Sequence, residues 1–422
     1  MILESILSIL NKYVKLGKGF LSKKNIYEPL DMPRRVILGP GPSSANPRVL
    51  RAMSLPIVGY LDPAFFDLLE KVSDMLNQIF LTKQMSFAVA GSGSAGMEAG
   101  LVSLAEPGDK VIICSYGYFC ERQIIMAKRL GLNVIPIRTE WGKSFDPQVL
   151  LDNLKNHTDT KLVLGIHAET STGTINPIKE MAKISHDFGA LFMTDVVTSL
   201  AGSELQFDEW EIDYAYSGSQ KCLAAPPGIS PVAMSTRALE FIRNRKTLPS
   251  SWYLDLSLIW DYWSENHVAH HTAPVSMIYG LREAVALTLN EGLFERWERH
   301  KVNASALRAG LKALNLDLPI SKSDRLDQLT VINLPKDVDD VKLRSKILEQ
   351  YSIEVGRGLG DFAGKVIRIG LMGESCYPPN VLYILQALEN ILPQFGIEIS
   401  QGNAVNAVSK EYSKNGIKKF YE

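Results

Sequence analysis

Short apolar runs alternate with amphipathic stretches between residues 36 and 291. Such alternation is typical of an α/β domain, in which helices cover a central sheet. Because most of these runs are continuously apolar and end in polar or glycine-containing turns, they predict buried, largely parallel strands. The strand candidates are residues 111–115, 133–138, 161–167, 190–194 and 229–234.

The pattern changes after residue 290, where long helical segments replace the short apolar runs. Helices are predicted at residues 294–314, 338–350 and 380–391, and a strand at 366–370. These segments predict a smaller α+β domain behind the large one. The chain is therefore divided into an N-terminal extension (1–35), a large domain (36–291), a small domain (292–398) and a polar tail (399–422) that we expect to be poorly ordered.

The first residues carry an amphipathic pattern of their own. Apolar residues recur at helical spacing at positions 2, 3, 6, 7, 10, 13 and 14, and lysines occupy positions 12, 15, 18, 23 and 24. The apolar stretch is too short for a membrane span, and it lacks the leading positive charge and cleavage site of a secretory signal. We expect a short helix that packs on another subunit, and we rank contact of residues 1–24 with a membrane surface below that.

The composition favours a metabolic enzyme with small-molecule partners. A chain of 422 residues exceeds what one core usually supports, and its 45 basic and 46 acidic residues leave no footprint for nucleic acid. The four cysteines are scattered, without the close pairing of zinc ligands, and are too few for a disulfide framework, so we expect a reducing compartment. Residues 419–422 do not match the Ser-Lys-Leu peroxisomal address, and we expect a cytoplasmic protein.

A glycine-rich turn is the first candidate for chemistry. Residues 91–96 read Gly-Ser-Gly-Ser-Ala-Gly between an apolar run and a helical run. Exposed N–H groups and the dipole at such a helix start form a site for phosphate. The spacing also fits a nicotinamide dinucleotide site, but the acidic residue expected after the next strand is missing at 111–116. A turn that binds nothing is the third interpretation.

Three single residues follow, each with a plain alternative. Asp195 ends an apolar strand and is placed to hold a cofactor ring nitrogen protonated, or else it caps a helix. Lys221 follows the hydroxyl and amide donors of Ser217, Ser219 and Gln220 and is a candidate for covalent catalysis, or else a surface lysine. Arg368 lies within an apolar strand, where it binds a substrate carboxylate or an internal acid.

In this order, the turn, the acid-ended strand, the lysine and the arginine resemble the class V aminotransferases of the fold type I pyridoxal-phosphate superfamily, in their alanine–glyoxylate (serine–pyruvate) branch. The similarity runs over residues 36–392. Its segments are LGPGP (38–42), GSG (91–93), TSTG (170–173), SGSQK (217–221), AAPPG (224–228), HHTAP (270–274) and RIG (368–370). The resemblance implies bound pyridoxal 5′-phosphate and a homodimer with composite active sites.

The resemblance also implies a role for individual residues. Lys221 and Asp195 are the catalytic residues, which bind the cofactor's aldehyde and ring nitrogen, respectively. The remaining cofactor contacts are Ser92, Gly93, Ser94 and Gln220 at the phosphate, Phe119 and Val197 on the ring faces, Thr170 at the phenolic oxygen, and Thr272 reaching the phosphate from the neighbouring subunit. Arg368, Gly39 and Thr170 bind the substrate. The chemistry requires no metal.

Three positions depart from the family pattern. Phe119 stands where a tryptophan is usual, and an aromatic face still serves there. Ala269 replaces a tyrosine whose hydroxyl binds the phosphate across the dimer interface, so cofactor affinity is expected to be lower. Tyr60 stands where relatives often have histidine, which indicates a change in substrate preference.

The predicted reaction moves the amino group of alanine or serine to glyoxylate or pyruvate by a ping-pong mechanism. Alternatives within the family are a serine–glyoxylate aminotransferase or another class V enzyme. A cysteine desulfurase would have to use Cys376, which has the only loop position among the cysteines, and we consider it the weaker candidate. A nicotinamide-dependent oxidoreductase is the rival from another class, and a non-catalytic scaffold is the last alternative.

Overall fold

The computed structural model describes residues 30–415. The chain divides into a unit that ends at Arg35 and a unit that begins at Val36, and the second contains all the elements described below. The helix predicted within residues 1–14 lies outside the described residues. No helix within 30–415 is long and apolar enough to cross a membrane.

A seven-stranded sheet forms the centre of the larger half, in the order β2-β10-β9-β8-β5-β3-β4. Pairing is parallel along β9-β8-β5-β3-β4, whereas β10 is antiparallel to both β2 and β9. The strands are β2 (Met85–Ala90), β3 (Lys110–Ser115), β4 (Asn133–Arg138), β5 (Leu162–Ile166), β8 (Leu191–Asp195), β9 (Tyr214–Tyr216) and β10 (Ile229–Met234). This sheet confirms the predicted α/β fold.

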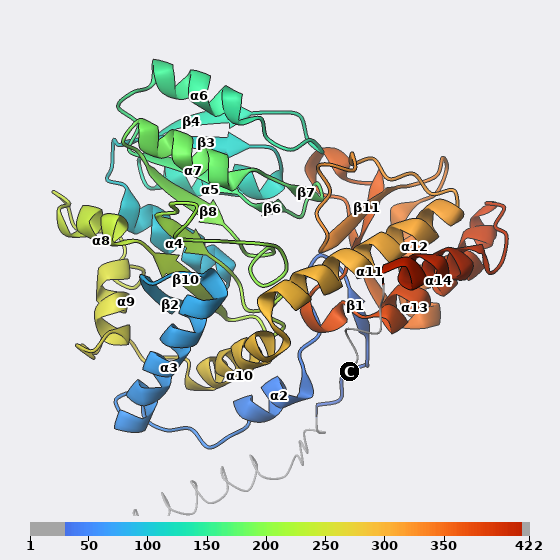
Figure 1. The fold of residues 1–422 in the computed structure, drawn as a ribbon, viewed down its shortest axis with the longest axis horizontal. Coiled ribbons are helices and arrows are strands. Elements are labelled where there is room, and N and C mark those ends of the chain that lie inside the picture. Colours follow the sequence, from blue (N-terminus) through green and yellow to red (C-terminus); the bar gives the residue numbers. More distant parts are fainter. Residues whose placement is uncertain (1–29, 416–422) are drawn as a thin grey trace, which may run out of the picture. The chain divides into compact units, whose positions relative to one another are not determined.

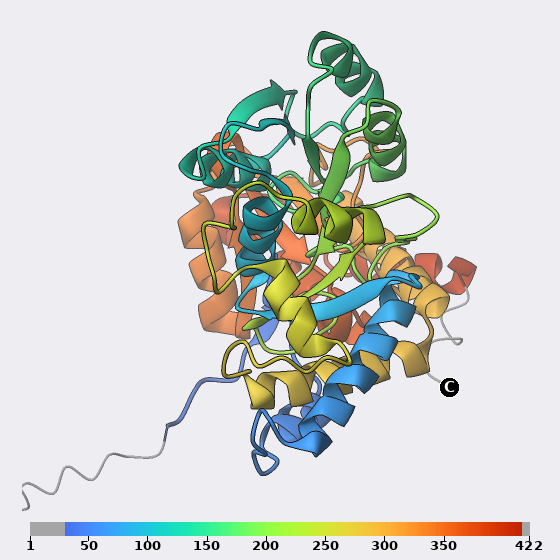
Figure 2. The ribbon, with the colours of Figure 1, turned by 90° about the vertical axis from the view of Figure 1, so that its left-hand side faces the viewer.

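Helices cover this sheet, as Figures 1 and 2 show. α4 packs on β8, β9 and β10, α5 on β3 and β4, and α7 on β5 and β8. The helices are α2 (Pro47–Met53), α3 (Pro63–Phe80), α4 (Gly93–Leu104), α5 (Tyr118–Arg129), α6 (Pro147–Asn156), α7 (Ile178–Asp187), α8 (Thr236–Arg243), α9 (Leu256–Trp263) and α10 (Val275–Glu291). Central strands such as β5 and β8 are buried along their whole length, which explains why their sequences are continuously apolar.

A four-stranded sheet with the order β1-β12-β13-β11 forms the smaller half. Its strands are β1 (Val36–Leu38), β11 (Leu329–Asn333), β12 (Ile353–Arg357) and β13 (Val366–Gly370), and its helices are α11 (Leu293–Ala313), α12 (Asp340–Tyr351), α13 (Pro378–Ile391) and α14 (Asn403–Asn415). A short hairpin of β6 (Ala168–Glu169) and β7 (Thr174–Ile175) follows β5. β1 pairs with β12, although the predicted boundaries assign residue 36 to the large domain. A pairing over that distance in sequence leaves no trace in local periodicity.

Helix α14 corrects the prediction of a poorly ordered polar tail after residue 399. Its buried residues Ala404, Val408 and Tyr412 recur every four positions and form one apolar stripe. The stripe packs on α11 and α13, and the Tyr412 hydroxyl donates to Asn303 Oδ1 at 2.8 Å. For residues 403–415 the tail prediction was wrong, because this stripe is narrow and the rest of the helix is polar; residues 416–422 lie outside the described residues.

The seven-stranded and the four-stranded sheet each have a hydrophobic core, and a third cluster lies between the two halves. That cluster includes Ala168 and Cys222 from the larger half, and Leu329, Val366 and Met372 from the smaller half. The apolar contact places the loop that carries Lys221 against the strand that carries Arg368. The candidate active site lies close to this contact.

Candidate active site

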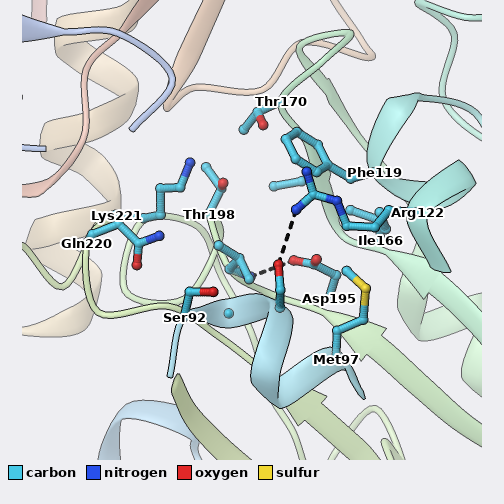
Figure 3. Close-up of a pocket in the computed structure, with 14 residues that line it drawn as sticks. Ser92, Met97, Phe119, Arg122, Ile166, Thr170, Asp195, Thr198, Gln220 and Lys221 are labelled. Carbon is cyan, nitrogen blue, oxygen red and sulfur yellow. Dashed lines mark hydrogen bonds between the residues drawn. The ribbon is translucent and has the colours of Figure 1, made fainter. Parts of the chain in front are cut away.

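A cavity of about 200 Å³ opens where β5 and β8 end and α4 begins. Figure 3 shows Lys221 and Gln220 on one side of it, Phe119 and Arg122 on the other, and Asp195 below. The predicted residues that line it are Ser92, Gly93, Ser94, Phe119, Thr170, Asp195, Val197, Gln220 and Lys221. Residues from five separate parts of the sequence therefore meet at one edge of the large sheet, where ligands bind in open α/β folds.

The glycine turn brings the start of α4 to the cavity. Gly91 has a φ of +130°, which favours glycine, and its N–H donates to Gly228 O at 3.0 Å. A Cβ at Gly93 would lie 2.8 Å from Val197 Cγ2, so only glycine permits this close approach. Ser92 is the N-cap, yet its side chain makes no capping hydrogen bond. Ala95 N donates to Ser92 O at 2.7 Å, and the amides of Gly93 and Ser94 stay available to an anion.

Asp195 ends β8 and is 6% exposed. Its Oδ1 accepts a hydrogen bond from Val197 N at 2.8 Å, so the carboxylate caps the following turn rather than an α-helix. Burial raises the pKa of Asp195 to about 7, against the opposing hydrogen bonds from Val197 and Tyr216. A carboxyl group held in this way gains most from a cationic partner in the cavity.

Lys221 projects into the cavity from the loop after β9. Its Nζ donates to the backbone oxygen of Pro40, and a side chain at Gly41 would collide with it. Burial lowers the pKa of Lys221 to about 8, although the charge of Asp195 opposes this change. The lower pKa increases the fraction of neutral amine, which is the nucleophilic form.

Arg368 lies in β13 and is 3% exposed. Its Nε donates to Arg357 O at 2.7 Å and its Nη1 donates to Thr170 O at 2.8 Å. Burial lowers the pKa of Arg368 to about 10. Among the described residues, no carboxylate forms a salt bridge with this guanidinium, although the charge of Glu169 favours its ionised form.

Sequence reasoning missed two charged residues at the cavity. Arg122 donates from Nη1 to Ser94 Oγ at 3.1 Å, and its guanidinium lies 5.0 Å from the centre of the Phe119 ring. Glu169 is fully buried beside the cavity and accepts from Ser171 N at 2.8 Å and Phe119 N at 3.2 Å. The position of Arg122 three residues after Phe119 on one helix was a usable signal.

Arg368, Thr272 and Gly39 are not among the residues that line the cavity, and Arg368 lies behind Thr170. Thr272 lies in a separate surface hollow together with Gly59, Tyr60 and Met277. Gly39 follows β1, and its backbone oxygen approaches Gly370 so closely that a Cβ there would collide with it. Gly39 therefore sits beside the end of the Arg368 strand. The role of Thr272 across a dimer interface stays a prediction.

Comparison with known proteins assigns the family. The family model described as "Aminotransferase class-V" matches residues 71–369. The chain is 39% identical to the (S)-ureidoglycine–glyoxylate transaminase of Bacillus subtilis, over 91% of this chain and 97% of that protein. It is 35% identical to the alanine–glyoxylate aminotransferase of Callithrix jacchus, over 87% of this chain and 90% of that protein.

The chain belongs to the class-V aminotransferases. A solved structure of an alanine–glyoxylate aminotransferase from Nostoc sp. superposes with a TM-score of 0.85 at 42% identity, covering 86% of this chain and 97% of that one. The fold is accordingly fold type I. Family membership decides against the nicotinamide-dependent alternative.

The class-V family implies pyridoxal phosphate, and the cavity fits it. The phosphate would meet the amides of Gly93 and Ser94 at the start of α4, and Gln220 lines the same cavity. Within the same cavity, Asp195 could pair with the ring nitrogen, Phe119 and Val197 could flank the ring, and the amine of Lys221 could reach the aldehyde.

Proposed function

We propose that this class-V aminotransferase moves the amino group of a small L-amino acid, alanine or serine, to a small 2-oxo acid, glyoxylate or pyruvate. The observation that carries the proposal is the shared cavity of Lys221 and Asp195, which has amides for a phosphate at one end and Arg368 behind Thr170 at the other. The relatives support the acceptor, since glyoxylate is named in both the transaminase and the aminotransferase.

Each residue has a defined task in this proposal. Bound pyridoxal phosphate supplies an aldehyde that takes up the amino group and a protonated ring that withdraws electrons. Asp195 holds the ring nitrogen protonated, and Ser92, Gly93, Ser94 and Gln220 hold the phosphate. Arg122 keeps the Ser94 hydroxyl and the Phe119 ring in place through its hydrogen bond and its contact with the ring face.

Lys221 and Arg368 act on the substrate. The Nζ of Lys221 takes the proton from the substrate Cα, and its lowered pKa of about 8 raises the fraction of amine that can do so. Arg368 has donors left after its bonds to Arg357 O and Thr170 O, and a planar guanidinium binds a carboxylate with two parallel hydrogen bonds. Because both substrates carry a carboxylate, one arginine serves both half-reactions.

(S)-Ureidoglycine is a second candidate for the amino donor. It is named in the bacterial relative that shares 39% identity with this chain over nearly the full length of both. One or two contacts to the donor's side chain are enough to choose between these substrates. Tyr60, in the surface hollow, is the departure from the family pattern that bears on this choice.

A homodimer with composite sites belongs to the same proposal. Large apolar side chains stay exposed on and around α2, among them Leu50, Leu55 and Ile57, and Ile57 also lines the hollow that contains Thr272. Such clustered exposure marks an interface. Thr272 of each subunit would then complete the phosphate site of the other.

The test is a donor and acceptor panel on the purified protein supplied with pyridoxal phosphate. We expect alanine or serine with glyoxylate to turn over with parallel double-reciprocal plots, and Lys221→Ala to lose turnover. Borohydride reduction followed by peptide mass spectrometry should find a pyridoxyl group on Lys221. Failure to bind pyridoxal phosphate, or a pyridoxyl group on another lysine, would refute the proposal. A preference for (S)-ureidoglycine would replace the donor and keep the mechanism.

A further inference from the structure

A buried charged cluster lies behind the Lys221 loop, where α10 ends and α11 begins. We define the arginine cluster as Glu291, Arg296, Arg299 and His300. Arg296, Arg299 and His300 are 5%, 1% and 0% exposed. None of the four lines the cavity described above. Burying two guanidiniums with one carboxylate has a large desolvation cost in free energy. The contacts of these arginines therefore indicate what role offsets that cost.

The carboxylate of Glu291 holds the two arginines together. Arg299 donates from Nε to Oε1 and from Nη2 to Oε2, the latter at 3.0 Å, and Arg296 donates from Nη1 to Oε2. Burial alone would raise the pKa of Glu291, but the bonds and charges of Arg299 and Arg296 lower it to about 2. The carboxylate therefore stays ionised, and the guanidiniums are fixed in orientation.

Arg296 reaches the backbone beside the proposed catalytic lysine. Its Nη2 donates to the carbonyl oxygen of Cys222, the residue after Lys221. The two preceding carbonyls are held as well, since Ser43 N donates to Gln220 O at 2.8 Å and Ser43 Oγ donates to Lys221 O at 2.7 Å. Three consecutive carbonyls around Lys221 are thus fixed by Ser43 and Arg296.

Arg299 and His300 reach the segment that follows the Arg368 strand. Arg299 Nη1 donates to Cys376 O at 2.6 Å and to Gly373 O at 3.1 Å. Gly373 N donates to His300 Nε2 at 3.0 Å, so this nitrogen is the acceptor and Nδ1 carries the proton toward Arg296 O at 2.7 Å. Burial lowers the pKa of His300 to about 3, which keeps the ring neutral and this tautomer in place.

The two segments held by the arginine cluster also touch one another directly. A Cβ at Gly373 would lie 2.8 Å from both Cys222 O and the Cβ of Ala224. The loop of Lys221 and the turn after β13 are therefore packed back to back. Arg296 binds the Lys221 loop, Arg299 binds the turn after β13, and both bind Glu291, so the cluster links the two segments.

We propose that Arg296 is a positioning residue for Lys221, which it holds through the carbonyl of Cys222. Through Glu291, Arg299 and His300 it also fixes the register between the Lys221 loop and the turn after the Arg368 strand. A planar guanidinium can bind a carboxylate and a carbonyl at once, which a lysine ammonium cannot do with the same rigidity. The inference rests on the proposed role of Lys221 as the residue that carries the cofactor.

The experiment compares Arg296→Met and Arg296→Lys with a matched control, Arg308→Met. Arg308 lies in the same helix and is likewise bonded to a carboxylate, Asp327 at 2.9 Å, and to a backbone oxygen, that of Leu326. Its partners lie outside the Lys221 loop. Arg308 is partly buried, so the control reports what the loss of a carboxylate-bonded arginine in α11 costs by itself.

The first readout is the reactivity of Lys221 in the cofactor-free protein. Limited acetylation over a pH series, quantified on the Lys221 peptide by mass spectrometry, gives the pH of half-reaction. We expect Arg296→Met to raise this pH by about one unit, a tenfold change in proton affinity, because the amine is released toward water. The pH of half-reaction of Arg296→Lys should lie between those of Arg296→Met and the wild type. That of Arg308→Met should match the wild type.

The second readout is the rate at which cofactor-free protein captures pyridoxal phosphate, which we expect to fall about tenfold in Arg296→Met and not in Arg308→Met. The proposal is wrong if Arg296→Met and Arg308→Met lose the same thermal stability and both keep the Lys221 reactivity of the wild type. The arginine cluster would then be structural only. If Arg296→Met does not fold, the profile of Arg296→Lys decides in the same way. Acetylation needs no transamination, so this result is independent of the proposed function.

Discussion

Asp195 carries an expected cost in stability that the cofactor-free protein should reveal. Folding raises its pKa from 3.8 to about 7, chiefly through burial. The folded protein therefore binds this proton more tightly than the unfolded chain, and stability falls as the pH rises from about 4 through about 7. At about 1.4 kcal/mol per pKa unit, the full loss is about 4 kcal/mol above that range. Asp195→Asn removes the charge and keeps an oxygen for Val197 N.

The assay is urea unfolding of the cofactor-free protein near pH 5 and near pH 8. We expect Asp195→Asn to be more stable than the wild type near pH 8, by up to about 4 kcal/mol, with a smaller gain near pH 5. Pyridoxal phosphate should reverse this order, since it stabilises the wild type more when its ring nitrogen pairs with the carboxylate.

Asp213→Asn provides the matched control, because Asp213 is equally buried but fully paired. It accepts from Phe192 N at 2.8 Å and from Ser235 Oγ and Arg237 Nη1 at 3.0 Å each. Removing its charge should destabilise the protein at both pH values. The reasoning about Asp195 is refuted if Asp195→Asn also destabilises the cofactor-free protein near pH 8.

Two further predictions concern the substrate arginine and the C-terminal helix. Arg368→Lys should lower kcat/KM about thirtyfold for both the amino donor and the oxo acid, because a charge-assisted hydrogen bond worth about 2 kcal/mol is lost. Steady-state kinetics with each substrate measures this. An effect on one substrate alone would contradict the shared role of Arg368. Val408→Ala should lower the free energy of unfolding by about 2 kcal/mol and expose residues 403–415 to protease. Val405→Ala is the control on the same helix. Equal stability and equal cleavage of the two variants would contradict the docking of α14.

Much of the site could be predicted from the sequence because its residues lie at the ends of strands. Asp195 and the turn at 91–93 both follow apolar runs, so their place at one sheet edge follows from the α/β pattern alone. Arg122 and Glu169 were missed because the sequence shows only a charged residue near a motif. Their importance comes from distant partners, since folding brings Ser94 to Arg122 and Phe119 to Glu169.

Much of the fold was also predictable from the sequence. The prediction failed where the structure depends on contacts between distant residues. The strand at 229–234 was predicted within a largely parallel set, but β10 is antiparallel to both neighbours. A strand buried on both faces is apolar in either direction, so its sequence does not reveal its orientation. The arginine cluster shows the same limit, since residues 291–300 read as a charged helix until Cys222 and Gly373 are seen beside it.

The active site and the arginine cluster behind it treat buried charge in opposite ways. The first disfavours the ionised forms of its residues, and the second stabilises them. Asp195 and Lys221 both have pKa values moved by burial toward their neutral forms, so the cofactor-free cavity holds free energy that a charged ligand can release. In the arginine cluster, by contrast, Glu291 is held ionised by two guanidiniums. A site that must stay unpaired until its ligand arrives needs rigid neighbours, because loop movement would let water reach the charges. Burying Arg296 and Arg299 is unfavourable, and we infer that the two arginines serve the reactivity of Lys221 rather than the stability of the protein.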